Sequence, residues 1–311
     1  LKHSGSLVSR IAGRPAEPRA SVRASIPLRS MAAAGGEGAE GPSSAEDAAP
    51  FWARMEAASI PSKPALHEAF LGELEAVAAA CTDRRGRVLD LGCGDGRLIA
   101  ELSARFPALD FLGVDVNEAA VAAARARAAE AESEAEAEAR RRRTSEQGSH
   151  RAGEPSLTFH VGDVTEVGEE ISGDFDLVLV QLVISVVGGV DRRRKLLRVA
   201  RQRLRPEGRV LLSASGASED INEQYAELYR KDEPLTGEFR TYFSRGADGQ
   251  VLYPTHHFTE DELSNLFSAE GLRICRLDRE REASSRRPDQ AAWFFYAVAG
   301  RAEASGETED T

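Results

Sequence analysis

The chain has 311 residues, a hydrophobic content of 41% and a formal net charge of −11 at pH 7. This length fits one large domain or two small ones, and the apolar fraction suits a globular core with polar segments added. The acidic balance argues against nonspecific nucleic-acid binding, which needs lysine and arginine to displace counterions from phosphates. No apolar run reaches the roughly 20 residues that span a bilayer, so we expect neither a nucleic acid nor a membrane as partner.

The first 50 residues differ in composition from the rest of the chain. Residues 1–30 contain five arginines, several serines and a single acid, Glu17, which is typical of an organelle transit peptide. The alternative is that Met31 starts the protein. We therefore expect a plastid or mitochondrial protein in the first case and a cytoplasmic one in the second. Alanine, glycine, glutamate and serine dominate residues 31–50, so we expect residues 1–50 to be disordered.

The folded domain is expected over residues 51–301, followed by a disordered tail over 302–311. Phe51 and Trp52 stand at its start and fit either the core or a lid. An amphipathic helix is expected to begin at Pro64. Its apolar stripe consists of Leu66, Phe70, Leu71, Leu74 and Val77.

Residues 88–98 are the most informative segment, because an apolar strand runs there into a glycine-rich loop and then a helix. Glycine adopts positive φ and lets a ligand approach the backbone, and the following helix directs its N-terminal N–H groups at that ligand. The spacing is G-x-G-x-G, whereas the dinucleotide fingerprint needs a third glycine where Arg97 stands. Asp90, two residues before Gly92, suits a ligand that carries an ammonium group. A tight turn without a ligand is the alternative.

Three further apolar segments end in polar residues. Strands are expected over 110–115, 156–161 and 175–181, followed or ended by Asp115, Asp163 and Gln181. Ligands of open α/β sheets bind at the carboxyl ends of the strands, so these side chains are expected in one site. The alternative for the two aspartates is a role as helix caps.

These segments resemble, in order, the motifs of class I S-adenosylmethionine-dependent methyltransferases, and Leu204–Leu212 resembles the family's fifth strand. The resemblance covers residues 85–300. It implies a Rossmann-like seven-stranded α/β sheet, mostly parallel with an antiparallel C-terminal strand, with helices on both faces.

The resemblance also implies site residues. Asp115 would bind both ribose hydroxyls, Asp163 would accept a hydrogen bond from the adenine amino group, and Gln181 would lie beside the transferable methyl. The residues expected at S-adenosyl-L-methionine are Asp90, Gly92, Cys93, Gly94, Gly96, Asp115, Val116, Asp163, Val164 and Gln181.

The three cysteines, Cys81, Cys93 and Cys275, have no C-x-x-C spacing. That argues for a reducing compartment and against a disulfide framework or a zinc site, and no metal is expected. We interpret Cys93 as a small loop residue and not as a nucleophile.

A disordered insertion is expected over residues 130–155. The helix that starts at Glu118 runs into five glutamates and then four arginines. Pairs such as Glu136 with Arg140 favour extension of this helix, whereas residues 144–155 are typical of a disordered loop. The arginine run suits nucleic acid, but the neighbouring glutamates favour a self-neutralising helix end.

A second insertion, over residues 215–258, follows the fifth strand, where a few residues are usual. A helix near Asn222 and a hairpin made by residues 239–243 and 251–253 are expected to form a lid over the acceptor. His256 and His257 would face opposite ways in a strand, so one of them can point into the site as a general base. The alternative is that both are structural.

The chain is expected to end in a capped helix and an antiparallel strand pair. Thr259 and Glu262 form a capping-box pattern, and strands are expected over 271–278 and 291–299.

The sequence favours methyl transfer to a small molecule by in-line displacement at the sulfonium methyl. The alternatives are a protein methyltransferase and a non-catalytic cofactor-binding subunit. Methyltransferases of exocyclic base amines carry an Asn/Asp-Pro-Pro-Tyr/Phe run where this chain has residues 181–184, Gln-Leu-Val-Ile, which argues against that group. Arg97 argues against a nicotinamide dehydrogenase.

Overall fold

A computed structural model describes residues 49–55, 66–143, 156–168, 171, 173–246, 249–284 and 289–303. The chain divides into two units, Leu1–Ala39 and Glu40–Thr311, and every described residue belongs to the second. The possible transit peptide, the loop over 144–155 and most of the C-terminal tail lie outside the described residues. Within the described part of the chain, no helix combines the length and apolar character that crossing a bilayer requires.

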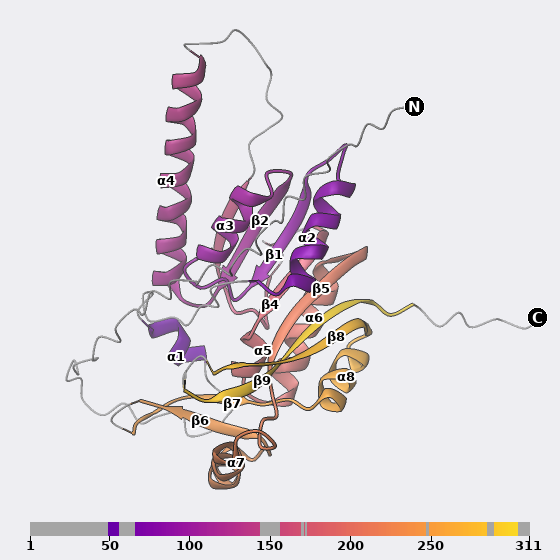
Figure 1. The fold of residues 1–311 in the computed structure, drawn as a ribbon. Coiled ribbons are helices and arrows are strands. Elements are labelled where there is room, and N and C mark those ends of the chain that lie inside the picture. The colour runs from indigo at the N-terminus through magenta and orange to yellow at the C-terminus, as the bar shows by residue number, and fades with distance from the viewer. Residues whose placement is uncertain are drawn as a thin grey trace, which may run out of the picture. The chain divides into compact units, whose positions relative to one another are not determined.

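Seven strands form the central sheet, in the order β3-β2-β1-β4-β5-β9-β8 (Figure 1). The first five run parallel, β9 pairs antiparallel with β5, and β8 pairs antiparallel with β9. The expected Rossmann-like sheet with an antiparallel C-terminal strand is therefore confirmed. The strands are β1 Gly86–Leu91, β2 Leu109–Asp115, β3 Leu157–Val161, β4 Phe175–Gln181, β5 Leu204–Gly216, β8 Leu272–Ala283 and β9 Ala291–Arg301.

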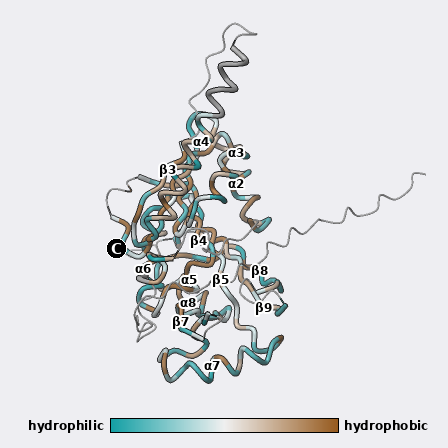
Figure 2. The backbone as a smooth tube through the Cα atoms, turned by 90° about the vertical axis from the view of Figure 1, so that its left-hand side faces the viewer, coloured by the Kyte–Doolittle hydropathy of each residue, from teal (hydrophilic) through white to brown (hydrophobic). Residues whose placement is uncertain are grey.

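Helices cover both faces of this sheet, because alternate residues of its buried strands point to opposite sides. Val88 packs with α2, α3 and α4 in one core cluster, whereas its neighbour Leu89 packs with α6 and α8 in the other. In Figure 2 the hydrophobic colour gathers on the central strands. The helices are α2 Glu68–Ala80, α3 Arg97–Arg105, α4 Glu118–Arg143, α5 Val183–Val186, α6 Val190–Arg203 and α8 Glu260–Ala269.

Two helices differ in extent from the expectation. Helix α2 begins at Glu68, because the His67 side chain accepts a hydrogen bond from the Ala69 N–H and caps the first turn. The expected start, Pro64, lies outside the described residues. Helix α4 continues to Arg143, so disorder from residue 130 is wrong, and the favourable glutamate–arginine spacing agrees with the longer helix.

The insertion after β5 contains the expected helix and hairpin. Helix α7 spans Glu223–Thr236, and Asn222 caps it by accepting a hydrogen bond from the Gln224 N–H. Strands β6 (Thr241–Arg245) and β7 (Val251–His256) form a separate two-stranded antiparallel sheet. A short helix, α1 (Ala49–Arg54), lies at the start of the described chain, two residues before the expected boundary.

Candidate active site

The glycine-rich loop between β1 and α3 has the backbone conformation that its sequence predicts. Gly92, Gly94 and Gly96 have φ values of 92°, 55° and 70°, in the left-handed region where a side chain is disfavoured. A Cβ on Gly96 would lie 2.6 Å from the Phe159 ring, and one on Gly92 would overlap Val183. Glycine is thus required both by conformation and by space.

Asp115, at the end of β2, ties this loop to the neighbouring strand. Its carboxylate accepts hydrogen bonds from the backbone N–H groups of Gly94, at 2.8 Å, and Asn117, at 2.9 Å. Burial raises the Asp115 pKa, although these backbone bonds oppose the rise. The strand end and the loop therefore present one continuous surface to a ligand.

Asp90 lies beside Asp115 and is 4% exposed. Burial, reinforced by the Asp115 charge, raises the pKa of Asp90 to about 7. Among the described residues, no arginine, lysine or histidine forms an ion pair with either carboxylate. A buried acid, Asp90, without a cationic partner fits a ligand that brings positive charge, and S-adenosylmethionine carries a sulfonium and an ammonium group.

The Asp163 carboxylate already accepts several hydrogen bonds from other residues of the protein. Its Oδ1 accepts hydrogen bonds from the Thr165 backbone N–H and hydroxyl, both at 2.8 Å, and its Oδ2 accepts one from Arg192 Nη2 at 2.7 Å. The capping alternative thus describes part of its role. The two Thr165 bonds use both lone pairs of Oδ1, but Oδ2 keeps a second one, so contact with an adenine amino group stays a prediction.

A cavity of about 240 Å³ opens at the carboxyl ends of β1, β2 and β4. It is lined by nine of the ten residues expected at the cofactor, and the tenth, Gly96, lies behind the loop against Phe159. Burial, together with the charge of Asp90, raises the pKa of the Cys93 thiol well above its usual range. The thiol therefore stays protonated, as suits a loop residue and not a nucleophile.

Aromatic side chains of the second insertion line the other half of the cavity. The sequence predicts a lid here but not which of its side chains face the cavity; the one signal for them is the concentration of tyrosine in the insertion. Serine and threonine hydroxyls lie between the rings. This acceptor half of the cavity is lined by Trp52, Tyr225, Tyr242, Ser244, Tyr253, Thr255, His257 and Phe294.

Trp52 lines the cavity, so of its two predicted roles, core or lid, the structure agrees with the lid. Its ring lies 4.5 Å from the Tyr253 ring, and the Phe51 ring lies 5.2 Å from the same tyrosine. The Asn117 side chain donates hydrogen bonds to the carbonyls of Trp52 and Met55, both at 2.7 Å. Helix α1 is thus held between β2 and the hairpin.

The two adjacent histidines have different environments. His257 lines the cavity; its Nδ1 lies 2.6 Å from the Tyr229 hydroxyl, and its Nε2 lies 3.4 Å from the Tyr242 hydroxyl. His256 does not line it. The structure therefore places His256 away from the cavity and His257 at its wall, so of the two candidates for a general base only His257 adjoins the cavity.

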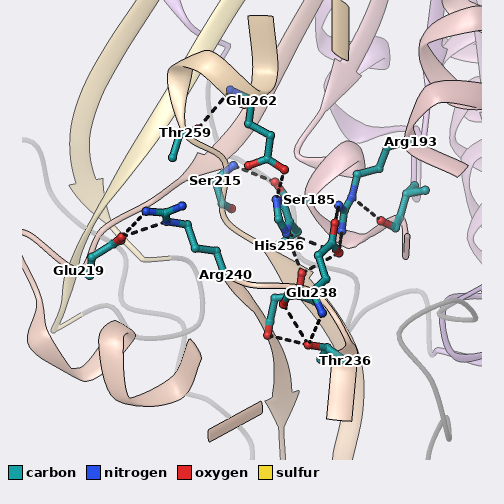
Figure 3. Close-up of polar contacts among 12 residues, drawn as sticks. Ser185, Arg193, Ser215, Glu219, Thr236, Glu238, Arg240, His256, Thr259 and Glu262 are labelled. Atoms are coloured by element: carbon teal, nitrogen blue, oxygen red, sulfur yellow. Dashed lines mark hydrogen bonds and ion pairs between the residues drawn. The ribbon is translucent and has the colours of Figure 1, made fainter. Parts of the chain in front are cut away.

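His256 instead belongs to a buried polar cluster that joins the insertion to the sheet domain (Figure 3). Its Nδ1 bonds Thr241 Oγ1 and its Nε2 bonds Glu262 Oε1, both at 2.7 Å. Burial lowers the His256 pKa, although Glu262 opposes the shift. Thr259 still caps α8 by accepting the Glu262 N–H, but the Glu262 carboxylate bonds the histidine.

Arg193 supplies the positive charge of this cluster. From α6 it donates to both carboxylate oxygens of Glu238, at 2.5 and 2.9 Å. Burial alone would raise the Glu238 pKa, but the Arg193 bonds outweigh it and lower the pKa. The ligand atoms of Glu238, His256 and Glu262 lie within 4.8 Å of one another, close enough to hold a metal ion. The Arg193 guanidinium, however, already neutralises the negative charge that such an ion would neutralise.

Comparison with known proteins agrees with this geometry. A family model described as a methyltransferase domain matches residues 89–210, which contain the glycine-rich loop, both strand-end aspartates and Gln181. The chain therefore carries a methyltransferase domain over residues 89–210. It is accordingly an enzyme, and its cofactor is S-adenosyl-L-methionine.

A solved structure shares the fold of this chain. A SAM-dependent methyltransferase from Methanosarcina mazei has a TM-score of 0.58 at 20% identity, over 72% of this chain and 96% of that one. A S-adenosylmethionine-dependent methyltransferase from Clostridium acetobutylicum has a TM-score of 0.45 at 14% identity, over 77% and 93%. A search of the curated proteins finds no significant match.

Proposed function

We propose that this methyltransferase acts on a small, planar and uncharged acceptor, enclosed by the lid over residues 215–258. The observation that carries the proposal is the continuity of one cavity from the glycine-rich loop to the aromatic side chains of the insertion. Aromatic rings bind flat apolar molecules by stacking and edge-to-face contact. A few hydroxyls among apolar walls are typical of small-molecule sites.

The charges around the cavity support an uncharged acceptor. Among the described lining residues, Arg192 is the single arginine or lysine, and it is paired with Asp163. A carboxylate or phosphate on the acceptor would therefore find no cation in the acceptor half. A cationic acceptor about 4 Å from the sulfonium would be repelled by about 4 kcal/mol at an effective dielectric constant of 20.

The chain's own residues bind and orient the reactants. In this proposal Asp115 holds the ribose, Asp163 the adenine and Asp90 the positively charged end of the cofactor, while Gln181 stands at the carboxyl end of β4. When bound, S-adenosylmethionine supplies a methyl group already activated by its sulfonium. The remaining contribution is alignment of the acceptor and exclusion of water.

Calorimetric titration with S-adenosylhomocysteine, with NAD as the control ligand, tests the cofactor assignments. We expect micromolar binding of the first ligand alone. Transfer of a labelled methyl group from the cofactor to a library of small aromatic compounds then tests the acceptor class. Label incorporated into protein and not into these compounds would contradict the proposal, and binding without any transfer would favour the non-catalytic subunit.

A further inference from the structure

The hydrogen bonds of Tyr229 determine which nitrogen of His257 carries a proton. Tyr229 is buried, and burial, followed by the charge of Glu219, raises its pKa far above the usual range, so its hydroxyl stays neutral. The hydroxyl oxygen lies 2.6 Å from His257 Nδ1, a separation that fits an O–H donor better than an N–H donor, whose bonds to oxygen are usually about 2.7–3.2 Å long. The Tyr229 hydrogen is therefore directed at Nδ1.

A neutral imidazole that accepts at Nδ1 carries its proton on Nε2. Nε2 lies 3.4 Å from the Tyr242 hydroxyl, on a ring that lines the cavity. The titratable groups packed around His257 are Tyr225 and Tyr229 from α7 and Tyr242 from β6. In this arrangement His257 carries an N–H donor at Nε2, beside the cavity-lining Tyr242, whereas a general base would carry a lone pair there.

We propose that His257 donates a hydrogen bond from Nε2 to an oxygen of the acceptor, and that the acceptor reacts as an oxyanion, such as a phenolate or an enolate. This inference rests on the proposed function and names its substrate class. The acceptor is uncharged in solution and loses its proton to solvent only on binding, when its oxygen lies next to the positive sulfonium. Its oxygen then forms a bond to the methyl carbon as the carbon–sulfur bond breaks, and the sulfur takes the electron pair.

The donor favours oxygen over nitrogen as the attacked atom. A phenolate oxygen has three lone pairs, so it can accept the Nε2 proton and still attack the methyl group. A neutral amine has one lone pair, which a hydrogen bond from His257 would occupy. The same donor therefore activates an oxygen acceptor by favouring its ionised form and disfavours an amine.

Nitrogen-15 NMR of protein labelled at histidine tests the tautomer directly. With S-adenosylhomocysteine bound, we expect His257 to show a protonated Nε2 and an unprotonated Nδ1. Tyr229→Phe should shift the ring toward the other tautomer. Tyr296→Phe is the matched control, because it removes a phenolic hydroxyl that bonds Glu282, outside the cavity. A wild-type ring protonated at Nδ1 would overturn the proposal.

The absorbance of 4-nitrophenol, whose anion is yellow, tests the oxyanion. We expect its apparent pKa to fall by about one unit, a tenfold change in ionisation, on binding to the protein loaded with S-adenosylhomocysteine. His257→Leu should abolish this shift, and His257→Gln, which keeps an N–H donor, should retain most of it. His160→Gln, a histidine on β3, is the control.

The two proposals fail in different ways. Absence of S-adenosylhomocysteine binding contradicts the cofactor assignments. Binding of S-adenosylhomocysteine without binding of 4-nitrophenol, or with the probe bound as a neutral phenol, leaves those assignments intact and overturns the role of His257. A shift that persists in His257→Leu overturns it as well, since the residue would then make no difference to the ionisation.

Discussion

The side-chain amide of Asn117 donates a hydrogen bond of 2.7 Å to the backbone carbonyl of Trp52, 65 residues earlier in the chain. Asn117 stands two residues after Asp115 and is fully buried. Its amide also bonds the Met55 carbonyl, so a single side chain holds helix α1 over the cavity. The wall formed by Trp52 thus depends on a residue next to the expected ribose-binding acid.

Asn117→Ser should loosen α1 while leaving α4 capped. The Asn117 side-chain oxygen accepts a hydrogen bond from the Ala120 N–H, and a serine hydroxyl can replace that cap but not the two donors to α1. We expect about tenfold weaker S-adenosylhomocysteine binding, which corresponds to about 1.4 kcal/mol. Calorimetry gives the affinity, and fluorescence in a Trp293→Phe background reports on Trp52. Unchanged affinity would mean that α1 does not contribute to the cofactor site.

Asp115→Ala should weaken S-adenosylhomocysteine binding by more than tenfold. The substitution removes both the acceptor for Gly94 and the carboxylate expected to hold the ribose. Asp110→Asn is the matched control, because Asp110 lies on the same strand, where its carboxylate pairs with Arg85. Equal affinities in a calorimetric titration of the two variants would remove the ribose assignment.

Asp90 should make the stability of the ligand-free protein pH-dependent. Its folded-state pKa of about 7 exceeds the ordinary value of 3.8, so between these values the native state binds more protons than the unfolded state. The free energy of unfolding therefore falls as pH rises from about 4 to about 7, and the loss is complete above that range. The raised pKa of Asp115 acts in the same direction.

Asp90→Asn should remove the Asp90 part of this dependence. We expect the ligand-free variant to unfold at a higher temperature than the wild type above about pH 7, and to bind S-adenosylhomocysteine more weakly there. Thermal unfolding across the pH range, with and without ligand, provides both readings. A variant whose stability follows the wild-type curve at every pH would show that Asp90 ionises normally in the folded protein.

Arg193→Met should destabilise the protein by about 3–5 kcal/mol, because it leaves Glu238 partly buried without its cation. Arg194→Met is the control: Arg194 is 42% exposed, and Arg198 also bonds its partner Glu270. We expect the control to cost at most about 1 kcal/mol. Urea unfolding gives both values, and hydrogen exchange should show faster opening of β6 in Arg193→Met. Similar losses in the two variants would contradict a special role for the buried pair.

Replacing residues 134–155 by a short glycine–serine linker should leave cofactor affinity unchanged. Strand β2 has seven residues, a length of about 23 Å, and a helix returning over that distance needs about 15 residues. Helix α4 has covered this distance near residue 132, and Ala128 is its last buried residue among those described. A replacement that prevents folding, as measured by circular dichroism, would show that this segment is structural.

The elements of this fold could be predicted because their signals are local. The apolar segments, the G-x-G-x-G spacing and the polar residues at the strand ends lie within a few positions of one another, and period and turn chemistry depend on such neighbours. They led to the strand sequence and to nine residues that line the cavity. The starts of α2 and of α1 were missed, because caps and packing partners decide them.

Which of His256 and His257 lines the cavity was decided by the tertiary structure alone. Adjacent histidines in an extended segment point to opposite sides, but the sequence does not say which side holds the cavity. That choice depends on Tyr229, 28 residues before His257, and on Glu262 from the next helix. The wall formed by Trp52 and Tyr253 likewise joins positions about 200 residues apart. Sequence periodicity determined the elements and the end of the sheet where a ligand lies, whereas the partners of each buried polar group depend on contacts that only the folded chain creates.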